Sequence, residues 1–405
     1  MSVLDRPAVV IDNGTGYTKL GYAGQNIPNY IVPSAVAHNF KKPRTITSNS
    51  FPDMDFFIGD EALKMARTYE VDYPLKHGQI ENWDMMEKYW HSCMFDYLRC
   101  NPEEHNFLLT EPPLNSPENR EYTAEVMFET FGVSGLYIGV QAVLALYGNL
   151  NPEEKVPITG TIIDSGDGVT HIIPIVEGYV VGSAIKHIPL AGRDITQFIA
   201  KMLRHREKSI PPHEVNAMAS YAKERHSYVC GDLAKEFNKF DDRPADKIKQ
   251  LTGIDSASGK QFEFDLGYER FLGPELFFRP EIFSTQFTTP LHELLDQSIQ
   301  ASPIDARRAL YGKICLSGGS TMFPKFDKRL QRDLAGIVNQ RMSDIRKRST
   351  QHVEDITVNV ETSPFQRFAV WYGGSKMAST PEFKHHVYTK ADYEEHGPKR
   401  FYSVL

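Results

Sequence analysis

The stretch Ala8–Gly24, AVVIDNGTGYTKLGYAG, joins a β-branched apolar run to an Asp-x-Gly-x-Gly turn and a second strand-like segment. The same order returns in Gly160–Tyr179, GTIIDSGDGVTHIIPIVEGY, with Asp12 and Asp164 in equivalent positions. Glycines at such a turn remove the side chains that would keep an anion away from the backbone N–H groups. Two such hairpins predict two duplicated α/β half-domains that close on a single nucleotide.

The size and charge of the chain exclude several classes of protein. It has 405 residues, of which 41% are hydrophobic and 24% charged, and a net charge of −7. This length predicts two or three domains of ordinary globular composition. A weakly acidic chain is not expected to have nucleic acid as its main partner. The most apolar long segment, Tyr137–Tyr147, is about half a membrane span and contains Gln141, so no membrane insertion is expected.

Cysteines and basic residues give no sign of a metal or nucleic-acid site. The four cysteines show neither zinc-type nor C-x-x-C spacing, which favours a reduced, cytoplasmic protein; they are Cys93, Cys100, Cys230 and Cys315. Four basic residues near the end of a predicted helix are interpreted as a solvated face; they are Arg341, Arg346, Lys347 and Arg348.

Strand-like and helix-like runs alternate along the chain, which predicts an α/β protein. The clearest strand-like runs are Val9–Ile11, Phe107–Leu109, Thr161–Ile163 and Lys313–Leu316. Apolar spacing and flanking Pro and Gly predict helices over Asn119–Phe131, Gln141–Tyr147 and Phe326–Lys347. Two stretches break this rhythm: His38–Pro52 is predicted to be a mobile surface loop, and Asn238–Lys260 an excursion from the second half.

The two aspartates suggest a metal ion between the hairpins. Asp12 and Asp164 would repel a phosphate chain unless a hard cation lay between them, and Mg²⁺ takes carboxylate and water ligands readily. Lys19 can reach a terminal phosphate from the strand that leaves the first hairpin. Neither hairpin has Walker spacing, and neither completes Gly-x-Gly-x-x-Gly, because Lys19 and His171 occupy the last position. One such hairpin alone would more often be an ordinary turn, whereas two with matching strands favour phosphate binding.

A third glycine turn, LSGGSTM at Leu316–Met322, follows a strand and precedes the long helix. Backbone amides at such a junction can bind a phosphate or the edge of a nucleoside. On its own, the pattern is equally typical of an ordinary tight connection. The similar Gly373-Gly374-Ser375 near the end is interpreted as a packing feature.

Together, the two hairpins and the third turn resemble the actin fold, which sugar kinases and heat-shock chaperones share. The resemblance to actins covers nearly the whole chain. Four more motifs carry it: YPLKHG at Tyr73–Gly78, TEPPLN at Thr110–Asn115, LAGRD at Leu190–Asp194 and YGGS at Tyr372–Ser375. The resemblance implies an actin-like ATPase fold of class α/β, with two duplicated halves around a central nucleotide cleft.

The resemblance also implies limits for the halves. The first half is expected over residues 1–154, with a small mobile subdomain at about 34–72. The second is expected over residues 155–366, with an outer subdomain at about 191–284. Residues 367–405 are expected to return to the first half.

The resemblance further assigns residues to ATP or ADP with Mg²⁺, or alternatively Ca²⁺. The phosphates would lie between Gly14, Thr15, Gly16, Tyr17 and Lys19 on one side and Asp164, Gly166, Asp167, Gly168 and Val169 on the other. The resemblance implies that Asp12 and Asp164 hold the metal through water. The nucleoside would border Gly192, Lys223 and Glu224, the last two in a helix expected over Ala217–Tyr228, and Gly318, Gly319, Ser320, Thr321, Met322 and Phe323.

The resemblance also bears on Arg367, Gln141 and His171. Arg367 stands where actins have a lysine near the adenine, and its planar guanidinium would change that contact. Gln141 and His171 match the residues that arrange the attacking water in actins, with Asp164 nearby. Neither is a strong base at neutral pH, and phosphoryl transfer depends mainly on positioning and charge neutralisation, so at most slow hydrolysis is expected. Without the family, Gln141 would be read as a polar residue at a helix start.

Several phrases outside the cleft resemble actin-related subunits of the actin-related protein 2/3 complex, which nucleates branched actin filaments. They are DFFIGDE at Asp55–Glu61, PENREYTAE at Pro117–Glu125, GYERFLGPE at Gly267–Glu275 and ASTPEF at Ala378–Phe383. The implied partners are actin-related protein 2, the other subunits of that complex, actin and nucleation-promoting activators, in the cytoplasmic cytoskeleton. The loops at 38–54 and 337–361 and the tail from Gly397 depart from that pattern.

Two alternatives stay open at this stage. A conventional filament-forming actin would share the cleft and differ in its surface contacts. A small-molecule kinase on the same fold would need a catalytic carboxylate base in addition to Asp12, Asp164 and Asp167.

Overall fold

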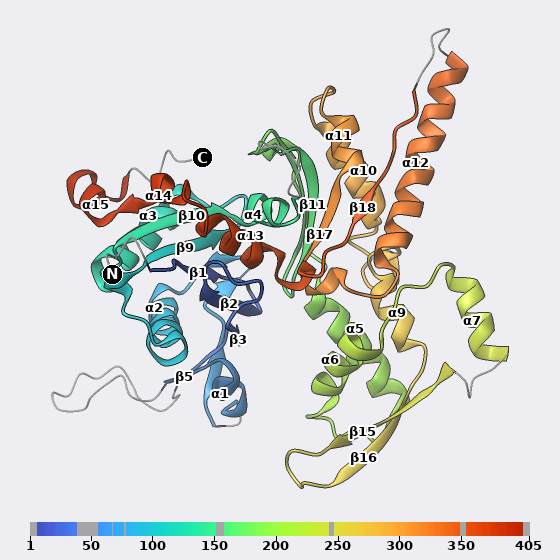
Figure 1. The fold of residues 1–405 in the computed structure, drawn as a ribbon. Coiled ribbons are helices and arrows are strands. Elements are labelled where there is room, and N and C mark those ends of the chain that lie inside the picture. The colour runs from blue at the N-terminus through green and yellow to red at the C-terminus, as the bar shows by residue number, and fades with distance from the viewer. Residues whose placement is uncertain are drawn as a thin grey trace.

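The computed structural model describes residues 6–38, 56–66, 68–76, 78–150, 158–242, 247–348 and 354–399. Two main β-sheets lie beside each other, and helices cover them (Figure 1). This arrangement confirms the predicted α/β class. No helix of the described ranges is long and apolar enough to cross a membrane.

The first sheet has six strands in the order β19-β10-β9-β1-β2-β3. They are β1 Val9–Asp12, β2 Tyr17–Tyr22, β3 Tyr30–Pro33, β9 Asn106–Glu111, β10 Gly135–Val140 and β19 Tyr388–Thr389. The central strand β1 runs antiparallel to β2, its partner in the first hairpin, and parallel to β9. All four residues of β1 are buried, because both faces of the sheet are covered.

The second sheet repeats this plan in the order β13-β12-β11-β17-β18, with β14 also paired to β12. Its strands are β11 Gly160–Ser165, β12 Thr170–Val176, β13 Tyr179–Val180, β14 Lys186–Ile188, β17 Ile314–Ser317 and β18 Val360–Glu361. Here β11 runs antiparallel to β12, its hairpin partner, and parallel to β17. The duplication read from the sequence is therefore a duplication of strand topology.

Smaller sheets lie outside these two. The three-stranded one has the order β5-β4-β6, and two-stranded ones join β7 to β8 and β15 to β16. Their strands are β4 Val36–His38, β5 Phe56–Ile58, β6 Glu70–Asp72, β7 Leu75–Lys76, β8 Gln79–Ile80, β15 Lys249–Ile254 and β16 Gln261–Leu266. The β15–β16 hairpin projects from the lower edge of the molecule in Figure 1.

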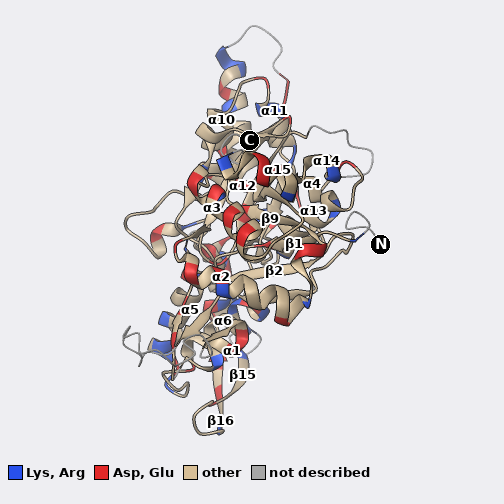
Figure 2. Cartoon of the chain, turned by 90° about the vertical axis from the view of Figure 1, so that its left-hand side faces the viewer, with Lys and Arg blue, Asp and Glu red and all other residues tan. Residues whose placement is uncertain are grey.

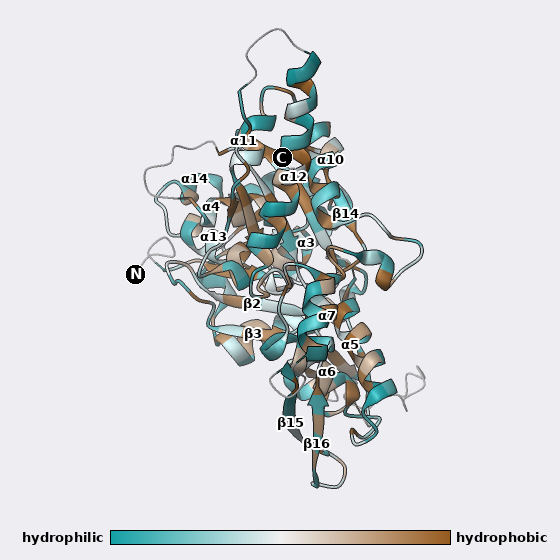
Figure 3. Ribbon diagram, turned by 90° about the vertical axis from the view of Figure 1, so that its right-hand side faces the viewer, coloured by the Kyte–Doolittle hydropathy of each residue, from teal (hydrophilic) through white to brown (hydrophobic). Residues whose placement is uncertain are grey.

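The helices differ widely in length. They are α1 Gly59–Lys64, α2 Trp83–Ser92, α3 Pro117–Glu125, α4 Gln141–Gly148, α5 Gly192–Arg206, α6 Val215–His226, α7 Leu233–Asp242, α9 Glu269–Glu275, α10 Leu291–Ala301, α11 Arg307–Gly312, α12 Phe326–Arg348, α13 Ala369–Ala378, α14 Phe383–His386 and α15 Lys390–His396. In Figure 3 brown, hydrophobic residues lie mostly on inner strands and inward helix faces, as expected for amphipathic elements.

The two sheets meet at a close crossing of helices α4 and α13. A Cβ on Gly373 would overlap the carbonyl of Leu144, and one on Gly148 would lie 3.1 Å from Cα of Gly373. The indole of Trp371 donates to the carbonyl of Val10 at 3.0 Å, which fixes α13 to β1. The interpretation of Gly373 and its neighbour as a packing feature is confirmed. With β19, α13 brings the end of the chain back to the first sheet, while the predicted limits of the halves stay a prediction.

The predicted strands are all present, and the helix predictions need small corrections. Helix α3 begins at Pro117 itself, because proline suits the first helical position, and Ser116 caps it by accepting from the Asn119 N–H at 3.2 Å. A π-helical turn at Val126–Thr130 follows. The predicted excursion Asn238–Lys260 contains a regular strand, β15, which pairs with β16.

Two further predictions concern the surface. Of the predicted loop His38–Pro52, only His38 lies within the described residues, as the last residue of β4. Figure 2 shows basic and acidic residues interspersed, with basic ones at the free end of α12. Arg341 does not belong to a solvated face: it hydrogen-bonds the Tyr311 hydroxyl at 3.2 Å and pairs with the partly buried Asp296.

Candidate nucleotide-binding cleft

A cleft of about 390 Å³ lies between the two main sheets, and both hairpins and the third glycine turn line it. The predicted site residues that line it are Asp12, Gly14, Thr15, Gly16, Tyr17, Lys19, Gln141, Asp164, Gly166, Asp167, Gly168, Val169, His171, Gly192, Lys223, Glu224, Gly318, Gly319, Ser320, Met322, Phe323 and Arg367. Thr321 is the exception. Its buried hydroxyl accepts from the Gln366 amide at 2.7 Å and donates to the Gly318 carbonyl at 2.8 Å, so it holds the turn from behind.

In the first hairpin, neighbouring side chains compensate the charge of Asp12. Antiparallel pairing places Lys19 directly opposite Asp12, and the Lys19 Nζ lies 3.0 Å from Asp12 Oδ2. The Thr110 hydroxyl, at the end of β9, donates to Asp12 Oδ1 at 2.8 Å. Asp12 is only 3% exposed. The buried carboxylate therefore has a cation and a hydroxyl donor within the protein, as a buried charge requires.

Gln141 belongs to this network. It is the first residue of α4, and its side-chain nitrogen donates to the Asn13 carbonyl at 3.2 Å. The same nitrogen lies 3.4 Å from Asp12 Oδ1 and 3.3 Å from the Thr110 hydroxyl. The side chain makes no cap to its own helix. Gln141 thus faces the first hairpin and the cleft, which a helix-start role alone would not require.

The second hairpin leaves its aspartate without a bonded cation. Asp164 lies opposite His171 in the hairpin, and the Ser317 hydroxyl of the adjacent parallel strand donates to Asp164 Oδ1 at 2.7 Å. Among the described residues, no basic side chain forms an ion pair with it. Burial raises the pKa of Asp164, and the charge of Asp12 acts in the same direction, while Ser317 and the charge of Lys19 oppose the shift.

His171 is a neutral hydrogen-bonding group. Its Nε2 lies 2.9 Å from Nδ1 of His187, which pairs with it across β12 and β14. Burial, and to a smaller extent the charge of His187, lower the pKa of His171 to about 4. At neutral pH the imidazole carries no charge, so it can orient a polar molecule but cannot supply a cation to the cleft.

The tips of the two hairpins touch each other. A Cβ on Gly16 would lie 2.7 Å from Cβ of Asp167, and one on Gly168 would lie 3.0 Å from Cγ2 of Thr15. These glycines are required because each loop approaches the other half of the molecule closely. The two hairpin tips therefore lie against each other where both line the cleft.

The third turn is fixed to the second hairpin. Gly318 has a φ of +89°, and a Cβ there would overlap the carbonyl of Ser165. The Ser320 hydroxyl donates to the Gly166 carbonyl at 2.7 Å. The turn therefore needs glycine both for its left-handed backbone and for the close approach of β11.

The remaining lining residues carry charge. The Lys223 ammonium donates to the Gly192 carbonyl at 2.9 Å, and burial lowers its pKa although Asp167 and Glu224 oppose that shift. Across the cleft, burial raises the pKa of the Tyr17 hydroxyl, and the charge of Glu224 adds to this. The charge of Glu224 in the second half thus acts on Tyr17 of the first half across the opening.

Comparison with known proteins identifies the family to which this chain belongs. The family model described as Actin matches residues 3–402 of the chain. The chain belongs to the actin family. The resemblance seen in the hairpins and the separate motifs, together with the predicted fold class, is confirmed.

Curated relatives within the actin family match over almost their whole length. "Actin-related protein 3" of Dictyostelium discoideum is 55% identical, over 98% of this chain and 97% of the relative. The proteins of the same name in Acanthamoeba castellanii and Caenorhabditis elegans are 54% and 53% identical, with the same coverage. This actin-family chain is thus similar to actin-related proteins 3 throughout, including both hairpins.

Three side chains that hold the aspartates of the cleft in this actin-family member were not predicted from the sequence. Thr110 is the next-to-last residue of β9 and Ser317 the last of β17, and the hydroxyl of each donates a hydrogen bond to the aspartate of the neighbouring hairpin. Arg193 binds Asp167 Oδ2 through Nε at 3.2 Å and Nη2 at 3.0 Å, and its guanidinium lies 5.4 Å from the centre of the Tyr73 ring. A search for polar residues at the ends of the parallel strands would have found Thr110 and Ser317, whereas Arg193 had no such signal.

Proposed function

We propose that the cleft of this actin-family chain binds ATP or ADP together with a divalent metal ion, Mg²⁺ in preference to Ca²⁺. The observation that carries the proposal is the meeting of two glycine-tipped hairpins from separate sheets, at Gly16 and Gly168, beneath a single cleft. Backbone N–H groups freed of side chains on both sides suit a chain of phosphates. The donor set fits the metal, because Mg²⁺ prefers carboxylate oxygens and water.

The assignment of residues follows the expectation from the family. The first hairpin, with Lys19, and the second, from Asp164 to Val169, would hold the phosphates. Asp164 and Asp12 would hold the metal through water, and the bound ion would neutralise phosphate charge. The nucleoside would border Gly192, Lys223, Glu224, Arg367 and the third turn from Gly318 to Phe323, including Thr321 as a support.

We further propose that any hydrolysis in this cleft is slow. Gln141 is held against the first hairpin and His171 against the second, so the two can orient a water from opposite sides. Neither Gln141 nor a His171 imidazole with a pKa of about 4 is a strong base at neutral pH. Positioning without a strong base suits slow hydrolysis of a nucleotide, with Asp164 holding charge nearby.

For the cellular role, we propose an actin-related subunit of the actin-related protein 2/3 complex. With actin-related protein 2 it would form the template from which a daughter actin filament branches. The two-way coverage of 97–98% with proteins named actin-related protein 3 supports this role over a conventional filament-forming actin. Actin, the other subunits of the complex and nucleation-promoting activators would be the partners, in the cytoplasmic cytoskeleton.

The native mass and subunit composition of the chain, tagged at its own expression level, test this role. We expect an assembly well above the 46.0 kDa of the chain, containing a second actin-like subunit. A homopolymer would instead support conventional actin, and a lone monomer would contradict a structural subunit. Equilibrium binding of a fluorescent ATP analogue, with and without Mg²⁺, tests the cleft separately.

A further inference from the structure

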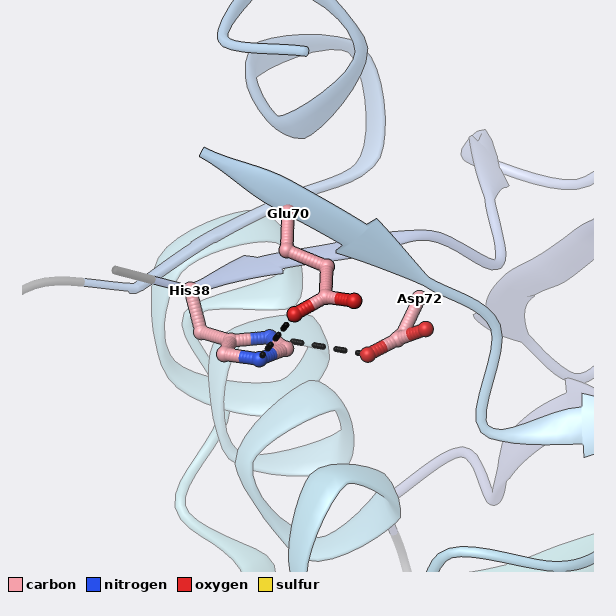
Figure 4. A group of neighbouring side chains, drawn as sticks. All are labelled: His38, Glu70 and Asp72. Atoms are coloured by element: carbon pink, nitrogen blue, oxygen red, sulfur yellow. Dashed lines mark ion pairs between the residues drawn. The ribbon is translucent and has the colours of Figure 1, made fainter. Parts of the chain in front are cut away.

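An imidazole and two carboxylates lie together on the small sheet β5-β4-β6, away from the nucleotide cleft (Figure 4). Antiparallel pairing places His38 of β4 opposite Glu70 of β6. Asp72 follows two residues later and therefore projects from the same face. One potential ligand atom from each of the three lies within 4.8 Å of the other two.

The three side chains face one another without forming hydrogen bonds. The Nε2 of His38 lies 3.5 Å from Glu70 Oε2, and its Nδ1 lies 3.8 Å from Asp72 Oδ2. Ligand atoms of a tetrahedral zinc site are roughly 3.4 Å apart, given metal–ligand distances of about 2.0–2.2 Å. Because the two measured distances involve different ring nitrogens, a single ion would bind only one of them. The separation that bears on the site is the 4.8 Å within which one potential ligand atom of each residue lies.

His38 also has a polar atom that the protein leaves unsatisfied. Its Nδ1 is buried and has no hydrogen-bond partner among the residues that the structure describes. A buried polar atom without a partner destabilises the folded state unless something binds it. Neither Glu70 nor Asp72 makes a hydrogen bond or an ion pair to any other residue in the described part of the chain. Lys76, whose charge acts on Asp72, forms its own ion pair with Glu81 at 2.8 Å.

A second cluster of the same residue types shows what a satisfied arrangement looks like. His213 Nε2 lies 2.8 Å from Asp255 Oδ1, which is a hydrogen bond. Asp255 also accepts from the Ala257 N–H and the Ser258 hydroxyl, and Glu214 accepts from the Ser256 N–H at 3.0 Å. These hydrogen bonds hold the pKa of Asp255 far below its usual value. Protein donors already use the carboxylates of this cluster, so an ion would have to displace them.

We propose that His38, Glu70 and Asp72 form a binding site for a divalent ion of the zinc class. Imidazole nitrogen with two carboxylate oxygens suits Zn²⁺, whereas Mg²⁺ and Ca²⁺ prefer oxygen ligands throughout. Three protein ligands leave one position for water. The ion would neutralise two facing carboxylates and cross-link β4 to β6 at the end of β4.

The test measures zinc binding by the full-length chain in the assembly from which it is isolated. The protein is treated with EDTA, reloaded with Mg-ATP, freed of unbound nucleotide by gel filtration, and titrated with Zn²⁺ against a chromophoric chelator. We expect His38→Gln and Asp72→Asn to lower the affinity for one equivalent of zinc by about 10–100-fold relative to wild type. His213→Gln is the matched control, and it should bind as wild type does.

Two results would overturn the site. One is equal zinc affinity and stoichiometry in wild type and in folded His38→Gln and Asp72→Asn, with folding checked by circular dichroism. The other is a sulfur shell in the zinc X-ray absorption spectrum at one equivalent, because the proposed ligands are nitrogen and oxygen only. Mg²⁺ or Ca²⁺ competing as well as Zn²⁺ would also contradict the assignment of the ion. None of these results is a measurement of nucleotide binding. Failure of the zinc site can therefore be distinguished from failure of the proposed function.

Discussion

The two Asp-x-Gly-x-Gly hairpins share one backbone plan and differ in the groups around their aspartates. In each, the aspartate lies opposite one residue of the return strand and accepts a hydrogen bond from a hydroxyl of the neighbouring parallel strand. In the first hairpin the opposite residue is Lys19, which pairs with Asp12 at 3.0 Å. In the second it is His171, which bonds to His187 instead.

This difference divides the chemistry of the cleft between its two sides. The charge of Asp12 is compensated inside the protein, whereas Asp164 has a hydroxyl but no bonded cation among the described residues. We therefore infer that the Asp164 side has the greater need of a bound metal ion. The two hairpins share a backbone plan but not a charge balance, because the residue opposite the aspartate is Lys19 in one and His171 in the other.

The largest effect is expected from Asp164→Ala. The variant lacks the carboxylate that has no ion pair with a basic side chain of the described residues and that is proposed to hold the metal. Mg-ATP binding should therefore be lost, and a fluorescent ATP analogue measures this. Because the proposed metal and phosphates stabilise the native state by mass action, thermal stability in ATP should fall to that of the nucleotide-free chain. Normal ATP binding by the variant would show that the two sides do not differ as proposed.

The next effect concerns pH. His171 has a pKa of about 4 in the folded chain and about 6.5 when unfolded. Between these values the unfolded chain binds more protons, so the stability associated with His171 is present above pH 6.5 and is lost as the pH falls towards 4. The loss should reach about 3 kcal/mol, and His171→Gln should remove it from the pH dependence of urea unfolding. Identical pH profiles would contradict a buried, neutral His171.

Lys19→Met tests whether Lys19 compensates the charge of Asp12 in the first hairpin. The variant leaves the buried Asp12 carboxylate without its cation, so the free energy of unfolding should fall by about 3 kcal/mol. ATP affinity should also fall, by about tenfold, because Lys19 faces the cleft. Lys19→Arg is the control, since it keeps the charge, and it should recover most of the lost stability. A variant as stable as wild type would mean that Asp12 is not balanced by Lys19.

The smallest effects come from the two hydroxyls. Thr110→Val removes the donor to Asp12 and an acceptor for the Asn13 N–H at 3.2 Å, so it should cost about 2 kcal/mol of unfolding free energy. Ser317→Ala removes only the donor to Asp164, and water from the cleft can replace it, so about 1 kcal/mol is expected. Denaturant unfolding of both variants measures the difference, and the reverse order would contradict the networks described.

Much of the fold and the cleft could be read from the sequence. The β-branched runs that lead into Asp12 and Asp164 predicted both central strands, and the glycines that follow predicted both hairpins. These features are local, because strand propensity and turn geometry depend on residues a few positions apart. Local motifs also carried the family, which the match over residues 3–402 confirmed.

Other features were decided only by the tertiary structure. Thr110 is 98 positions from Asp12 and Ser317 is 153 from Asp164, yet parallel strand pairing brings each hydroxyl to its carboxylate. The turn residue Thr321 looked like part of the cleft, but its hydroxyl packs behind the turn, against Gln366. Sequence patterns describe neighbours along the chain, whereas charge compensation depends on neighbours in space. The sequence alone therefore determined where the two carboxylates stand, and the pairing of distant strands decided which of them the protein itself neutralises.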